Sequence, residues 1–408
     1  MGKITRLKYA CYATNVTMSV VGNLSPLLFL TFRDLYGISY SLMGLLVLIN
    51  FMTQLGVDLM FSFFSHKFNI SATVKPTPAL AVVGLIVYSV FPFLLPQYAY
   101  MGLVLGTLIA SAASGLAEVL ISPVIAALPA KDPDREMSKL HSIYAWGVVA
   151  VIVISTLFLW VFGRKNWQWL GLLFALIPLL STVLFMGSDV PTMTTPKHTA
   201  GAFAFLKDKG LWLCVCAIFL GGAAECTMAQ WCSGYLEQAL SLPKVWGDIF
   251  GAAMFATMLG LGRTLYANIG KKISRVLFYG AIGATLCYLL AAICPLPIVS
   301  LVACGLTGLC TSMMWPGSLV VAENRFPTGG VFIFAIMAAG GDLGASVGPQ
   351  LIGIITDAAL KNPAMLSLAS ELSLSPEQLG MKAGMLMGML FPLLAIAVFA
   401  CFRRQRNE

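Results

Sequence analysis

Long apolar runs recur along the whole chain, and each is long enough to cross a lipid bilayer as a helix. A transmembrane helix needs about 20 mostly apolar residues to span about 30 Å of hydrocarbon. Such runs lie at 9–31, 39–64, 76–95, 98–129, 139–163, 166–187, 210–236, 244–268, 273–294, 296–323, 328–358 and 379–402. We therefore predict an all-α membrane protein with twelve transmembrane helices.

The composition agrees with a membrane protein and argues against a soluble one. Hydrophobic residues make up 59% of the chain and charged residues only 10%, whereas soluble domains are about 45–50% apolar. The net charge of +8 could suggest a nucleic-acid partner. However, the basic residues concentrate in alternate loops, so we expect the lipid bilayer and not nucleic acid as the large partner.

The distribution of basic residues also predicts the orientation. Lysine and arginine are more frequent in the loops on the side that carries both termini, including Lys271, Lys272, Arg403 and Arg404. Cytoplasmic loops are enriched in these residues. We expect a multi-pass protein of the bacterial inner membrane with both termini in the cytoplasm. The first apolar run is too long for the core of a signal peptide and should remain as a helix.

A polar segment divides the spans into two sets of six. Residues 188–209 contain prolines, threonines and charges, which are typical of a connection between helices. We predict a bundle at 1–187, a cytoplasmic linker at 188–209 and a second bundle at 210–408. A shift of 193 residues lays Glu118 and Pro123 over Thr311 and Pro316, which supports an internal repeat.

Four acids lie well inside the predicted spans, namely Asp58, Glu118, Glu225 and Asp342. A charge at the centre of a bilayer costs about 2.5–3.5 kcal/mol on insertion scales, so such acids indicate functional sites or structural ion pairs. Lysine and arginine are absent from the deep parts of the predicted spans. Protonation is then the simplest way to neutralise the acids. We predict proton-coupling roles for Glu118, Glu225 and Asp342.

Three stretches of the sequence form recognisable motifs. They are Glu118 with Pro123 and the run LHSIYAWG at 140–147, the run SMMWPGSL at 312–319, and the run AIMAAGG at 335–341. These stretches resemble the major facilitator superfamily, and within it most closely the fucose/galactose/gluconate-type sugar:proton symporters. The resemblance implies two pseudo-symmetric six-helix bundles that work by alternating access. Members often carry an aspartate in the first helix, where this chain has Asn15 and Asn23. Glu225, on the symmetry-related seventh helix, is our candidate replacement.

The same resemblance suggests gating residues. Major facilitator transporters usually carry a gating motif after the second helix, and residues 65–69 are a degraded version of it. Residues 262–272, in the mirrored loop, resemble the motif more closely. We predict that Asp58 and Arg263 belong to a cytoplasmic gate.

Aromatic and amide side chains inside the spans suggest a sugar site. A neutral polyol needs a flat apolar surface and neutral hydrogen-bonding partners, whereas a large organic anion would need central cations. The predicted substrate-binding residues are Asn23, Gln54, Tyr144, Trp146, Gln230, Trp231 and Trp315. Packing between helices is the alternative role for each of them.

Together these patterns predict a secondary transporter that imports a monosaccharide or similar small polyol with protons. Sodium is the alternative coupling ion. The chain has no GxxxxGK[ST] motif for ATP, no HExxH motif and no paired CxxC spacing, so we expect no enzyme activity, cofactor or metal. The rival functions are an exporter of drugs or amphipathic metabolites, and a non-transporting membrane sensor or intramembrane enzyme.

Overall fold

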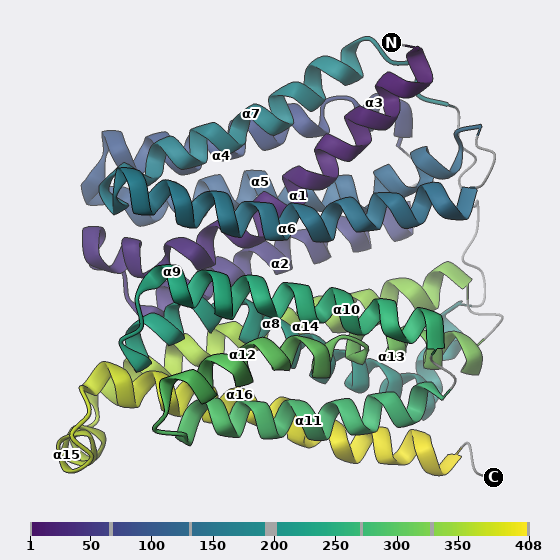
Figure 1. Ribbon diagram of the computed structural model, residues 1–408. Helices are drawn as coiled ribbons and strands as arrows, with labels where there is room; N and C mark the ends of the chain where they lie inside the picture. The colour runs from purple at the N-terminus through teal and green to yellow at the C-terminus, as the bar shows by residue number, and fades with distance from the viewer. Residues whose placement is uncertain are drawn as a thin grey trace. The chain divides into compact units, whose positions relative to one another are not determined.

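The computed structural model describes residues 2–64, 68–129, 133–191, 202–269, 272–326 and 330–405. Within these ranges every regular element is helical (Figure 1). The α-helices are α1 (Lys3–Tyr36), α2 (Tyr40–Phe64), α3 (Ile70–Val74), α4 (Thr77–Leu94), α5 (Ala99–Ala126), α6 (Pro133–Phe162), α7 (Trp167–Met186), α8 (Lys209–Leu240), α9 (Lys244–Trp246), α10 (Met254–Ile269), α11 (Ile273–Ile293), α12 (Pro297–Thr311), α13 (Met314–Arg325), α14 (Gly330–Lys361), α15 (Pro363–Glu371) and α16 (Pro376–Gln405).

The described residues contain 12 segments long and apolar enough to cross a membrane. This confirms the predicted all-α membrane fold. The tenth span differs in detail, because the helix expected at 296–323 is two helices, α12 and α13, separated by Ser312 and Met313. The eighth span also begins irregularly, with a π-helical turn at Gly247–Ala253 (η5) ahead of α10.

The chain divides into two compact units. The first contains Met1–Tyr36 and Met52–Thr199, and the second contains Gly37–Phe51 and Ala200–Glu408. Residues 192–201 of the linker expected at 188–209 lie outside the described residues, as do residues 65–67 of the degraded loop at 65–69 and residues 270–271 of the mirrored loop at 262–272. The boundary between the units falls inside α2, so the first half of this helix, up to Phe51, belongs to the second unit. The sequence analysis did not predict this division.

Small residues bring the helices of the first unit close together. A Cβ atom added at Gly106 of α5 would lie 2.5 Å from the Cα of Tyr88 in α4, and one added at Gly84 would lie 2.5 Å from the backbone nitrogen of Ala110. Close backbone approach at small residues is a common way to pack helices in membranes. This interface fixes α5, which carries Glu118, against its neighbours.

The second unit uses the same device between α8 and α14. A Cβ atom at Gly348 would lie 2.9 Å from the carbonyl oxygen of Ala223. Near the end of α14, the carboxylate of Asp357 accepts hydrogen bonds from the backbone nitrogens of Tyr40 (3.2 Å) and Ser41 (2.7 Å). An acid at a helix N-terminus satisfies unpaired donors and complements the helix dipole, so Asp357 holds the start of α2 in the second unit.

Candidate functional site

In the first unit, α2 and α5 approach closely at Gly115. A Cβ atom there would lie 3.1 Å from the Cα of Gln54 and 3.1 Å from the Cβ of Val57. Beside this contact, the hydroxyl of Ser114 donates a hydrogen bond of 3.4 Å to the amide oxygen of Gln54. Gln54 is thus held by α5 and is largely buried.

This contact also brings together two acids that the sequence analysis assigned to different roles. Asp58 lies one turn after Gln54 on α2, and Glu118 lies one turn after Ser114 on α5, so both carboxyls follow the hydrogen-bonded pair. The two carboxyls interact electrostatically with each other, and among the side chains that the structure describes, which do not include those of residues 133–139, no cationic group pairs with either. Asp58 Oδ1 is buried and has no hydrogen-bond partner in the described part of the chain.

Exposure distinguishes these two acids. Glu118 is an exposed residue of the unit, whereas Asp58 is partly buried. Exposure of a carboxylate to hydrocarbon would carry the cost given above for a charge in the bilayer. The face of α5 that carries Glu118 is therefore expected to meet water and not lipid.

The remaining predicted residues of this unit lie on α1 and α6. The side-chain nitrogen of Asn23 donates to the carbonyl of Ser19 (2.9 Å), and the hydroxyl of Ser19 donates to the carbonyl of Tyr144 (2.9 Å). Tyr144 is 38% exposed and Trp146 is 73% exposed. Ser19 and Tyr144 thus connect α1 to α6, and the side chains of Tyr144 and Trp146 leave aromatic surface uncovered.

In the second unit, Glu225 of α8 pairs with Arg263 of α10. Arg263 Nη2 lies 3.0 Å from Glu225 Oε1 and 3.2 Å from Oε2. The glutamate side chain is 12% exposed and the arginine side chain 44% exposed. Arg263 lies within a candidate membrane span, Lys244–Tyr266. The expectation that the deep acids lack cationic partners is therefore wrong for Glu225.

Arg263 also contacts the break in the tenth span. Its Nε donates a hydrogen bond of 3.1 Å to the carbonyl oxygen of Ser312, between α12 and α13. Proline lacks a backbone N–H, so Pro316 cannot provide the donor that this carbonyl would receive in a continuous helix. The break could therefore have been predicted from Pro316 in the sequence. Broken helices are common at transporter binding sites.

Trp315 lies beside this break, against two glycines. Cβ atoms added at Gly222 and Gly341 would lie 3.0 and 2.6 Å from atoms of its indole ring. The residue remains partly exposed. Asp342 follows Gly341 on α14 and, like Glu225 and Arg263, lies near Cys226. An aromatic face, two acids and an arginine are thus gathered in one part of the second unit.

Two predicted sugar ligands are placed differently. The side chain of Trp231 is 0% exposed, and its indole nitrogen donates a hydrogen bond of 2.8 Å to the carbonyl of Pro349. Trp231 therefore ties α8 to α14 and offers no stacking surface in this structure, which corrects the expected role. Gln230 is 7% exposed and is likewise largely covered.

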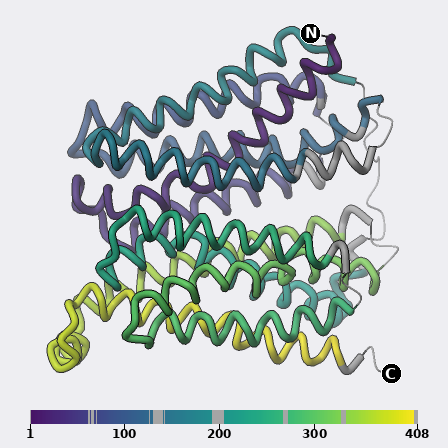
Figure 2. Tube along the Cα trace, in the orientation of Figure 1, coloured from purple at the N-terminus to yellow at the C-terminus, as the bar shows by residue number. Residues whose placement is uncertain are grey.

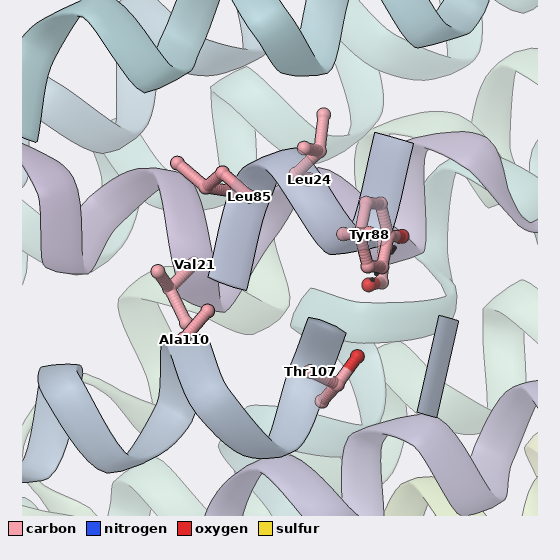
Figure 3. Close-up of a pocket in the computed structure, with 7 residues that line it drawn as sticks. Val21, Leu24, Leu85, Tyr88, Thr107 and Ala110 are labelled. Carbon is pink, nitrogen blue, oxygen red and sulfur yellow. Dashed lines mark hydrogen bonds between the residues drawn. The ribbon is translucent and has the colours of Figure 1, made fainter. Parts of the chain in front are cut away.

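A small cavity lies elsewhere in the first unit, among α1, α4 and α5 (Figure 3). Ser25 and Tyr88 share a hydrogen bond of 2.7 Å beside it, and Thr107 Oγ1 is buried without a partner among the described residues. Its volume of about 20 Å³ suits one water molecule and is too small for a sugar. None of the predicted site residues lines this cavity.

Comparison with known proteins identifies the family. The profile of the Major Facilitator Superfamily matches residues 10–349. The chain belongs to this superfamily. Membership of a family of membrane transporters indicates a transporter and not an enzyme. A comparison with curated protein sequences gave no match.

Solved structures of other transporters share the fold. The nucleoside transporter NupG has a TM-score of 0.73 at 13% identity, covering 98% of this chain and 99% of its own. A bacterial homologue of the human lysosomal transporter Spinster has a TM-score of 0.72 at 13% identity, covering 98% and 96%. A variant of the E. coli fucose:proton symporter FucP has a TM-score of 0.61 at 15% identity and covers 100% of both chains. At these identities the likeness shows the fold alone.

Proposed function

We propose that this superfamily member is a secondary active transporter that couples proton movement to import of a monosaccharide or similar small polyol by alternating access. The observation that carries the proposal is the carboxyl pair of Asp58 and Glu118, for which the described side chains, those of residues 133–139 not included, provide no cationic partner. The distribution of basic residues supports a bacterial inner membrane location with both termini in the cytoplasm.

The carboxyl pair suits a proton carrier because two neighbouring carboxylates repel each other. Uptake of one proton removes this repulsion and lowers the charge that the span must carry. Glu118 is the more exposed member and is the group that exchanges its proton with water. The sequence analysis assigned Asp58 to a gate. In this proposal it is instead the neighbouring carboxylate whose charge determines how readily Glu118 takes up a proton.

Glu225 and Asp342 are secondary proposals for proton coupling. The charge of Glu225 is balanced by Arg263 in a pair with two oxygen contacts. A paired carboxylate has less to gain from protonation than an unpaired one. We therefore rank Glu225 below Glu118, and Arg263 remains a proposed gating residue through its contact with the broken helix.

The substrate class rests on the surroundings of Trp315. Its indole is supported by Gly222 and Gly341 and is partly exposed, which suits stacking on the apolar face of a sugar ring. Arg263 and Glu225 form a neutral pair beside it, compatible with a neutral solute. The fold shared with a fucose:proton symporter supports the same class.

Uptake into proteoliposomes with an imposed pH gradient tests the proposal. The purified protein should accumulate at least one sugar from a radiolabelled panel. Glu118→Gln should abolish this accumulation but retain substrate exchange, because the amide keeps shape and hydrogen bonding without titrating. Asp34→Asn is the matched control, since Asp34 is 58% exposed and pairs with Arg164. Full accumulation by Glu118→Gln would move the proton site to Asp342.

Two further measurements test the rest of the proposal. Amphipathic drugs that compete where free sugars do not would favour an exporter, and absence of flux for any solute would favour a sensor. Reporter fusions after Lys67 and Lys197 should both report cytoplasm. A periplasmic signal from either fusion would contradict the proposed orientation.

A further inference from the structure

The connection between the last two spans contains a helix that the sequence analysis did not predict. α15 is capped at both ends. At its start, Asn362 Oδ1 accepts hydrogen bonds from the backbone nitrogens of Ala364 (2.9 Å) and Met365 (3.4 Å). At its end, Ser373 adopts φ +54°, and the backbone nitrogen of Leu374 bonds the carbonyl of Ala369 at 2.9 Å. Such caps indicate a specifically built helix.

This helix buries almost none of its own surface. Ala369 is its only buried residue, whereas Leu366 is 39%, Leu368 is 40% and Leu372, just after the helix, is 54% exposed. Isolated helices shorter than about 12–15 residues are marginal in water. A nine-residue helix therefore depends on the surfaces that it packs against, which include α14 and α16, and its exposed leucines are available to a further one.

The residues of α15 divide into two faces. Leu368 and Leu372 are four positions apart and lie on one face with Met365. Ser367, Ser370 and Glu371 occupy the other side of the helix. The helix is thus amphipathic. Ala369, its one buried residue, lies on the aliphatic face four positions after Met365, so the protein covers part of this face and leaves Leu368 and Leu372 exposed beside it.

The ends of the neighbouring helices locate this surface. α14 ends at Lys361, directly before the cap residue Asn362, and α16 begins at Pro376. Both helices contain candidate membrane spans. Figure 2 shows the chain leave α14, coil through α15 and return along α16. α15 therefore directly follows one candidate span and precedes the next, which places it near a membrane surface.

We propose that α15 is an interfacial helix that lies on the bilayer surface with Leu368 and Leu372 at the boundary between headgroups and acyl chains. Residues 362–375 contain no lysine or arginine and one glutamate. Attraction to lipid is therefore hydrophobic and does not require anionic headgroups. This inference goes beyond the proposed function, since it depends on neither the solute nor the coupling ion.

Lipid quenching of a fluorescent amino acid tests the proposal on the full-length protein in nanodiscs. The label is placed at position 368, on the aliphatic face, or at position 367, one residue away on the polar face. Lipids brominated near the headgroup end of the acyl chain should quench the label at 368 at least about twofold more than at 367, as expected for a helix in the interface plane. Replacing neutral with anionic lipid should not change this ratio.

Three outcomes would overturn the inference. Equal quenching at the two positions would show that the aliphatic face does not meet lipid. Stronger quenching of 368 by aqueous iodide than by brominated lipid would place that face in water. A signal that appears only when nanodiscs hold two protein molecules would identify a second copy as the partner.

A second variant guards against effects of the label itself. Leu368→Ser with Leu372→Ser should raise hydrogen exchange of the amides in 363–372 in nanodiscs, while Ser367→Ala should not. Unchanged protection in the double variant would also contradict the proposal.

Discussion

Arg263 donates a hydrogen bond of 3.1 Å to the carbonyl oxygen of Ser312, the carbonyl that Pro316 leaves without a donor inside its own helix. The same guanidinium holds both carboxylate oxygens of Glu225. One side chain therefore connects an acid on α8, its own helix α10 and the break between α12 and α13. We therefore expect a change at Glu225 to affect the broken helix through the Arg263 guanidinium.

Removing Arg263 should destabilise the second unit. Arg263→Ala removes the group that Glu225 and the Ser312 carbonyl contact. We expect the free energy of unfolding to fall by about 1–3 kcal/mol, and nearer the lower value because the arginine is partly exposed. Thermal unfolding of the purified protein measures the loss. Arg263→Lys should restore only part of it, because lysine cannot contact both groups with a planar fork. If Arg263→Lys were as stable as the wild type, simultaneous contact of Arg263 with Glu225 and the Ser312 carbonyl would not be needed for stability.

An exposed ion pair provides the control for this experiment. Lys3 and Asp189 lie 2.7 Å apart with both side chains 76% exposed. The hydrogen bond from Lys3 lowers the pKa of Asp189. Any stabilisation from the pair is therefore present above the unfolded pKa of about 3.9 and is lost as pH falls through the lower folded value. At neutral pH, Asp189→Asn should change thermal unfolding much less than Arg263→Ala.

Pro316→Ala should close the break in the tenth span. Alanine restores a backbone N–H four residues after Ser312, which can bond the carbonyl now held by Arg263. We expect slower hydrogen exchange at residues 312–316 and a lower transport rate, with unfolding temperature unchanged or raised. A normal transport rate with a closed helix would show that the break is not needed for function.

The contact at Gly115 should tolerate no large side chain. In Gly115→Leu the new side chain meets the backbone of Gln54. We expect the free energy of unfolding to fall by about 1–3 kcal/mol because of overpacking, and we expect proton-driven uptake to be lost. Gly56→Leu is the matched control on α2, because nothing lies within 4 Å of a Cβ atom there. Equal effects of the two substitutions would mean that the approach of α2 to α5 is unimportant.

Trp231 and Trp315, both in the second unit, should behave differently. Trp231→Phe removes the hydrogen bond to Pro349 and should cost about 0.5–1.5 kcal/mol of stability without changing substrate affinity. Trp315→Ala should weaken substrate binding by roughly 1–3 kcal/mol. Calorimetric binding and thermal unfolding on both variants separate these effects. Unchanged affinity in a folded Trp315→Ala protein would make this residue a packing residue.

The sequence predicted the number of spans because each apolar run carries its own signal, independent of its neighbours. It also located Glu118, since an acid in an apolar run is visible by itself. It could not place Asp58 beside Glu118 or Arg263 beside Glu225, because those pairs depend on which helices pack together. The break at Ser312 could have been predicted from Pro316. α15 was missed because its nine residues are too few to stand out as an apolar run.

The division of α2 has a mechanical consequence. Residues up to Phe51 belong to the second unit, where Asp357 fixes the first turn, and residues from Met52 belong to the first unit, where Gly115 receives the helix. The first turn of this continuous helix is thus held by the second unit, and its later turns pack against α5 of the first unit. Under the proposed alternating-access cycle, we expect movement of the units to bend α2 or to break one of these contacts, so that the stiffness of the helix adds to the energy barrier.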